Sequence, residues 1–101
     1  MAVLNAIGVQ TLAVSSAVVS LTLPSGKTPG PSHALLQNTG SNVIRWTADG
    51  TNPSATVGQQ LVAGATIQFM DPTGTYSGVL KFFKAIRESA DSTLEIAYFA
   101  T

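Results

Sequence analysis

Short stretches in which apolar and polar residues alternate recur along the chain, separated by clusters of Gly, Pro, Asn and Asp. Alternation with a period of two predicts half-buried β-strands, and the clusters between them predict turns. The clearest example is "AVVSLTL" at 17–23, preceded by Ser15 and Ser16, which separate it from an earlier strand. The other predicted strands are 9–14, 33–38, 42–48, the short piece 61–62, 65–70 and 92–100.

The predicted strands also assign side chains to faces. In 42–48, Ile44 and Trp46 share one face, and Val43 and Arg45 share the other. In 65–70, Ile67 and Phe69 lie together, and in 92–100 the residues expected to face inward are Leu94, Ile96 and Tyr98. The segment "PSGKTPGPS" at 24–32 predicts a loop, because its three prolines and two glycines disfavour pairing.

The segment "VLKFFKAIRESA" at 79–90 fits two structures. Its apolar residues recur at intervals of three and four, which is typical of a helix. Aromatic residues suit strands, however, and Gly78 directly before Val79 is no strong N-cap, although Ser77 is a candidate cap for a helix that starts one residue later. We predict a strand over 79–87 and keep the helix as the alternative.

These elements predict an all-β fold, a small antiparallel β-sandwich (jelly-roll-like or barrel-like) of about seven or eight short strands. The chain has 101 residues, which suits a single domain over 1–101 with one modest core. The sequence contains no internal repeat.

Charge is scarce in this chain. Asp, Glu, Lys and Arg make up 10% of the residues, against about 25% in an ordinary soluble domain, and the formal net charge is zero. A small surface with so little charge tends to associate, so we predict a homo-oligomer or other obligate assembly. The alternative is a monomer coated with Ser, Thr, Asn and Gln.

The composition excludes several classes of function. The chain has no cysteine, so disulfides, thiol catalysis and cysteine zinc sites are excluded. Its five basic residues form no dense patch, so we predict no nucleic-acid partner. The apolar start at 1–21 has no Lys or Arg before it and is interrupted by polar residues, so we predict neither a signal peptide nor a membrane span.

Catalytic chemistry has weak candidates. His33 is the only histidine, and no nucleophile motif such as GxSxG accompanies it. A histidine at the start of a strand more often makes a structural hydrogen bond. Glu88, Asp91 and Glu95 lie near one predicted turn with Arg87, which is typical of a solvated hairpin and not of paired acids in a cleft. We predict that the protein is not an enzyme.

Candidate metal ligands and a candidate sugar platform are also present in the sequence. Asp49, Asn52 and Asp71 carry oxygen ligands of the kind calcium prefers, but "DGTNPS" does not match the EF-hand pattern. Turn chemistry explains them better, so we predict no metal and no cofactor. Trp46 is either a core or interface anchor, the favoured interpretation, or part of a sugar-stacking platform with Tyr76 and Tyr98.

The segment "VIRWTADGTNPSATVGQQLVAGATIQF" resembles a motif of small tailed-bacteriophage virion proteins. In these, a strand ends in an Arg-aromatic pair and is followed by Asp-Gly-Thr, a Pro-containing loop ending in Gly, a Leu and a Gly turn. The matching residues here are Arg45, Trp46, Asp49, Gly50, Thr51, Pro53, Ala55, Thr56, Gly58, Leu61 and Gly64. The segments "VQTLAVSSAVVSLTLP" and "KFFKAIRESADSTLEIAYF" are similar to the opening and closing strands of the same proteins.

The resemblance implies a non-enzymatic virion structural protein, above all a capsid decoration (cement) protein in a particle assembled in the host cytoplasm. Its expected partners are the major capsid protein or other virion proteins and further copies of itself, with a homotrimer favoured. The expected interaction loop consists of Trp46, Asp49, Thr51, Asn52, Pro53 and Thr56. Residues 1–9 are a candidate assembly arm with Val3, Leu4 and Ile7, the alternative being a plain first strand.

An alternative function follows from the same resemblance. Related β-sandwich modules occur in connectors, tails and head fibres. In such a position the loop at 49–58 and Trp46 would hold a host-surface glycan.

Overall fold

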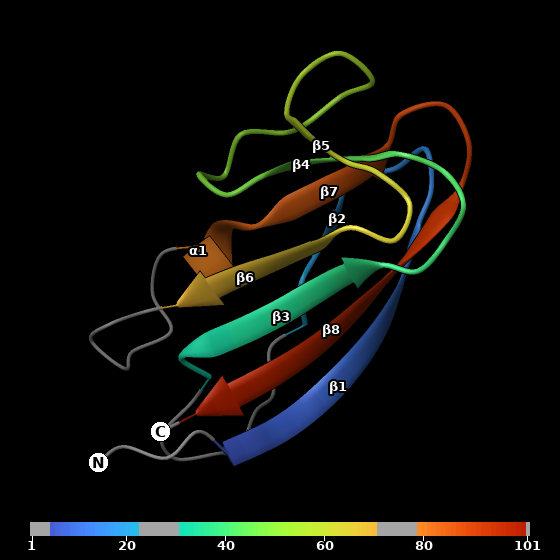
Figure 1. Cartoon of the computed structure of the whole chain (residues 1–101). Coiled ribbons are helices and arrows are strands. Elements are labelled where there is room, and N and C mark those ends of the chain that lie inside the picture. The colour runs from blue at the N-terminus through green and yellow to red at the C-terminus, as the bar shows by residue number, and fades with distance from the viewer. Residues whose placement is uncertain (1–4, 23–30, 71–78, 101) are drawn as a thin grey trace.

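The computed structural model describes residues 5–22, 31–70 and 79–100. They form two four-stranded antiparallel sheets (Figure 1). Sheet A has the order β1 (Asn5–Val14), β8 (Ser92–Ala100), β3 (His33–Asn38) and β6 (Thr66–Met70). Sheet B has the order β2 (Val19–Ser20), β7 (Lys84–Arg87), β4 (Ile44–Thr47) and β5 (Gln59–Leu61). The predicted all-β sandwich is confirmed.

The strand order is that of a jelly roll. Strand β1 pairs with β8, β2 with β7, β3 with β6 and β4 with β5, as if one long hairpin had been rolled up. Only β4 and β5 follow each other within one sheet, while the other connections pass from one sheet to the other. Of the two architectures expected from the sequence, the jelly-roll arrangement is therefore the one formed.

The core lies between the sheets and is filled by the alternate residues of each strand. Strand β8 shows this best, because Leu94, Ile96 and Tyr98 are at most 1% exposed while the residues between them are partly exposed. The bounds of β3 and β8 and the inward face of β8 agree with the sequence prediction. Across the gap, Ile44 on β4 and Ala85 on β7 complete the core from sheet B.

One buried polar residue ties the sheets together. Asn38, at the end of β3, is 0% exposed. Its amide nitrogen donates hydrogen bonds to the carbonyl oxygens of Asn42 (2.7 Å) and Leu61 (2.9 Å). Its amide oxygen accepts from the Gly40 N–H (3.1 Å) and the Ser92 hydroxyl (2.7 Å). All four hydrogen bonds that the side chain offers are made. Asn38 therefore links the β3–β4 connection to the end of β5 and the start of β8 without leaving an unsatisfied buried group.

Two sequence predictions were wrong. The segment 79–87 is not one strand: a single helical turn, α1 (Val79–Phe82), precedes β7. The change of period explains this, because Leu80 and Phe83, three residues apart, are both buried, whereas Ala85 follows Phe83 at strand spacing.

The segment 17–23 is also shorter than predicted. Strand β2 covers only Val19–Ser20, which pair with Ala85 and Lys84. Strand β7 starts at Lys84, separated from the end of α1 by one residue. Because Ser20 already pairs with Lys84, the chain beyond Ser20 has no β7 residue left to pair with. Leu23 lies outside the described residues. In sheet A, strand β1 begins at Asn5, four residues before the predicted strand.

Candidate interaction loop

The loop 48–58 joins β4 to β5 and projects beyond sheet B at the top of Figure 1. Beneath it lies a cluster of three aromatic rings. Trp46 stacks on Phe83 with ring centroids 5.8 Å apart, and Phe69 meets the edges of both rings at 5.5 and 5.9 Å. Trp46 is partly buried and packs against the core. Its ring therefore anchors the base of the loop, as the favoured sequence interpretation expects.

The proposed sugar platform is not assembled by the residues that the structure describes. Tyr98 is 1% exposed on the inner face of sheet A, and its hydroxyl donates to Gln10 Oε1 at 2.8 Å. Burial raises the pKa of this phenol well above its usual range. Tyr76 lies outside the described residues.

The first half of the loop is held by local hydrogen bonds. The Thr51 N–H donates to Asp49 Oδ1 at 3.0 Å, and the Thr47 hydroxyl donates to the Thr51 carbonyl oxygen at 2.5 Å. The bond from Thr51 also lowers the pKa of the Asp49 carboxyl. Lys84 Nζ donates to Asn52 Oδ1 at 3.0 Å and so ties the loop to β7. Asp49 thus makes the turn contact predicted for it, whereas Asn52 accepts from a side chain on another strand.

The second half closes on itself around Ser54. Its hydroxyl oxygen accepts from the backbone N–H groups of Thr56 (3.3 Å) and Val57 (3.1 Å), and its own N–H donates to the Val57 carbonyl oxygen at 2.9 Å. Pro53 is buried. Gly58 ends the loop with a φ of 116°, and a Cβ built there would lie 2.9 Å from the Trp46 carbonyl oxygen. Only glycine fits this backbone without strain.

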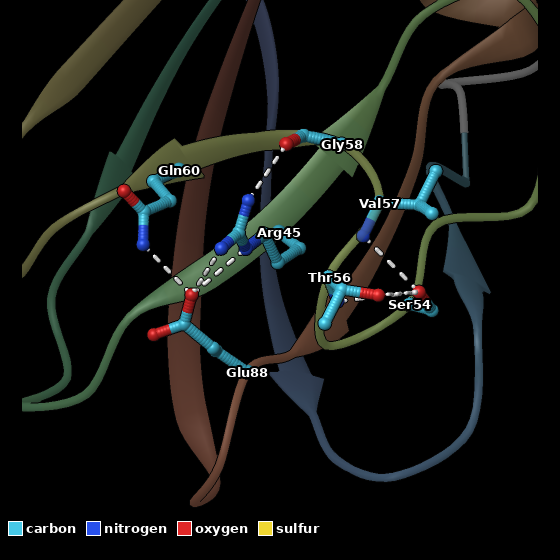
Figure 2. A network of polar contacts seen from close by, with 7 residues as sticks. All are labelled: Arg45, Ser54, Thr56, Val57, Gly58, Gln60 and Glu88. Carbon is cyan, nitrogen blue, oxygen red and sulfur yellow. Dashed lines mark hydrogen bonds and ion pairs between the residues drawn. The ribbon is translucent and has the colours of Figure 1, made fainter.

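Arg45 connects the loop to sheet B from the outer face (Figure 2). Its Nη1 donates to the Gly58 carbonyl oxygen at 3.0 Å, while its Nε and Nη2 approach Glu88 Oε1 at 2.8 and 2.7 Å. Gln60 Nε2 donates to the same oxygen at 2.7 Å. The bonds from Gln60 and then Arg45 lower the pKa of the Glu88 carboxyl. We call Arg45, Gln60 and Glu88 the Arg45 clamp; it holds the end of the loop at Gly58 and the middle of β5 at Gln60.

The other candidate side chains are dispersed. Glu88 binds Arg45, Asp91 binds Arg87 at 2.6 Å, and Glu95 Oε1 accepts from the Thr11 hydroxyl at 2.5 Å on the opposite sheet. They therefore form no acid pair. His33 Nδ1 lies 2.7 Å from the Ser32 hydroxyl. Among residues 5–22, 31–70 and 79–100, no three His, Asp or Glu side chains gather as metal ligands.

The surface at the base of the loop is concave. Its base borders a shallow hollow of about 210 Å³, lined by Trp46, Thr47, Ala48, Asp49, Gly58 and Gln59. Five of the six predicted loop residues lie in the loop 48–58, and the sixth, Trp46, lies two residues before it. Of the predicted arm, Ile7 lies within β1, at an irregularity in its pairing with β8, and packs against the core; Val3 and Leu4 lie outside the described residues.

Sequence reasoning missed the clamp. Arg45 was singled out only as part of a motif, and Glu88 only as a turn residue. Their contact joins positions 43 residues apart, and the local signal for it was weak: Arg45 is predicted on the outer face of its strand, where a charged partner on the neighbouring strand is favourable.

Comparison of the chain with family models, curated proteins and solved structures found no significant match. None of the described helices is long and apolar enough to cross a membrane. Inferences about function therefore depend on the geometry of the chain and on the sequence resemblance.

Proposed function

We propose that the protein is a non-enzymatic structural component of a phage virion, and that it decorates the capsid by binding between capsid subunits. The observation that carries this proposal is the jelly roll whose projecting loop is ordered by its own contacts. This architecture recurs among viral capsid proteins, lectins and cupins, so the fold alone is compatible with several functions. The sequence resemblance favours the first.

The loop has the properties of a docking element. Hydrogen bonds that Asp49 and Ser54 accept from loop N–H groups, and one that Arg45 donates to Gly58, already fix its conformation. An ordered loop loses little conformational entropy when it meets a partner, so more of the contact energy remains for binding. The candidate residues on its surface carry little charge, which suits a permanent neutral contact better than a reversible ionic one.

The proposal is tested by adding the purified protein to capsids assembled without it. We expect saturable co-sedimentation and a higher temperature of capsid disruption. The variant Thr51→Arg places a bulky charge on the exposed loop and should weaken binding, while Val62→Arg, in the exposed turn after β5, serves as the control. Absence of binding by the unmodified protein would contradict decoration.

A second candidate is a tail, connector or head-fibre module that binds a host-surface glycan. The observation that favours it is the hollow beside Trp46, where Asp49 and Gln59 offer polar groups next to an aromatic ring. An array of host glycans separates the two proposals. Binding that is lost in Gln59→Ala, with folding intact, would support the glycan function.

A further inference from the structure

The outer face of sheet A carries almost no charged side chains on its described strands. Three rows of side chains cross it, as given by the register of the four strands. In the order β1, β8, β3, β6, the rows are Ala6–Phe99–His33–Met70, Val9–Ala97–Leu35–Gln68 and Thr11–Glu95–Gln37–Thr66. Glu95 is the only Asp, Glu, Lys or Arg side chain that the described strands place there. Val9 and Met70, at the two edges, are 74% and 68% exposed.

Two of the three rows on this face are mainly apolar, and the third is polar. Large exposed apolar residues on a strand surface attract other chains, and sheets pack face to face at about 10 Å when both faces are apolar. The four strands have ten, nine, six and five residues, and at about 3.4 Å per residue and about 4.8 Å between strands they give roughly 500 Å² of flat area per copy. A pair that covered this whole face would bury roughly 1,000 Å², the lower bound of a specific interface.

We propose that a second copy of this chain covers the outer face of sheet A across a two-fold axis that runs along the strands between β8 and β3. This pairing does not depend on a place in a virus particle. It differs from the homotrimer that the sequence resemblance implies.

The central strands are complementary to themselves under this axis. The rotation places β8 over β3 of the copy and preserves each row. The small Ala97 then meets the large Leu35 of the copy, and Phe99 meets His33. Alternation of small and large residues across facing positions is what allows two layers to interdigitate. An isologous contact of this kind makes each pairing twice.

The single carboxylate also finds a partner. Glu95 and Gln37 are neighbours in the same row, so the axis sets each Glu95 over Gln37 of the copy. The Gln37 amide makes a long bond, 3.4 Å, to the Gly64 carbonyl oxygen within its own chain, and its N–H groups are suited to a carboxylate. The charge is thereby hydrogen-bonded and not buried alone.

The edges match in shape. Val9 stands on β1, and the same row ends on β6 at a hollow of about 230 Å³ whose lining includes Leu35, Gln68, Met70 and Phe99. The two-fold axis brings the exposed Val9 side chain of each copy to this hollow of the other. A protruding residue and a hollow at equal distances from the centre are what a self-complementary surface needs.

Sedimentation equilibrium of the purified chain tests the pairing. We expect the mass of a dimer, and we expect Val9→Lys to raise the dimer dissociation constant about 100-fold because the charge would be buried without a partner. Met70→Lys, on the opposite edge, should do the same. Val62→Lys is the matched control: this valine is 53% exposed but lies in the turn between β5 and β6, outside the three rows of sheet A.

Three results would overturn the proposal. The first is a monomer at a concentration of hundreds of micromolar. The second is the mass of a trimer. The third is an equal loss of association in Val62→Lys and Val9→Lys. Circular dichroism of each variant separates loss of pairing from loss of folding.

Discussion

The two sheets of this sandwich present opposite outer surfaces. On sheet B, Arg45, Glu88 and Lys84 are engaged with neighbouring side chains or with the loop 48–58. On sheet A, the outer face is dominated by Val9, Leu35, Ala97, Phe99 and Met70. Both faces belong to four-stranded antiparallel sheets, so the difference in polarity comes from the side chains that point outward.

The few charged side chains of this chain are unevenly distributed between the two outer faces. Polar groups on the outer face of sheet B bind one another, and these contacts order the loop 48–58. On the outer face of sheet A, the polar side chains that make contacts within the chain are Thr11 with Glu95, His33 with Ser32, and Gln37 through one long bond. The polar groups of one side are therefore satisfied within the chain, and the other side is the face for which we propose self-association.

The largest effect is expected under the loop. Trp46→Ala removes a ring that packs on Phe69 and Phe83, and it should lower the free energy of unfolding by about 3–5 kcal/mol. Phe82→Ala is the control, because Phe82 is 45% exposed, and it should lose less than about 1.5 kcal/mol. Urea denaturation measures both. Equal losses would show that Trp46 is no anchor.

The end of the loop gives the next effect. Gly58→Ala forces a side chain into a positive φ and against the Trp46 carbonyl oxygen, with an expected loss of about 2–3 kcal/mol. Gly64→Ala also has a positive φ of 81° but meets nothing within 4 Å, so its loss should be only about 1 kcal/mol. The difference between the two, measured by thermal unfolding, isolates the close approach to Trp46.

A smaller effect is expected from the Arg45 clamp. Arg45→Ala removes the bonds to Glu88 and Gly58 and should lower stability by about 1–2 kcal/mol. A double-mutant cycle with Glu88→Gln measures the coupling of the pair. If the two losses simply add, the clamp does not act as a unit, and the loop is ordered by its local turns alone.

The smallest effect concerns pH. The folded state lowers the pKa of Glu88, so its contribution to stability is complete above the ordinary glutamate range and is lost as pH falls through the lowered pKa. The stability difference between the unmodified protein and Glu88→Gln should therefore shrink below about pH 4. A difference that stays constant between neutral and acid pH would contradict a charged clamp.

Much of the fold could be predicted from local pattern. Strands β3 and β8 follow from alternation, because each has one face in the core. Alternation failed at β2, where pairing is limited by the start of β7, which lies more than sixty residues later in the chain. It also failed at α1, where the sequence changes period within a few residues.

The candidate site was only partly predictable for a similar reason. Turn chemistry at Asp49 and Ser54 is encoded by near neighbours, so the loop could be located. The Arg45 clamp and the bonds of Asn38 to Leu61 and Ser92 join distant segments, and no single stretch of sequence contains both partners. The register of sheet A, which creates its apolar face, likewise exists only once four separate strands have paired.

The central claim, that this chain is a structural part of a virion, is tested most directly by its copy number. Quantitative mass spectrometry of purified particles from the source of the gene gives that number. Decoration of the capsid predicts hundreds of copies per particle. A dozen or so would move the protein to the connector, tail or fibre and favour host binding. Its absence from the particle would contradict the account.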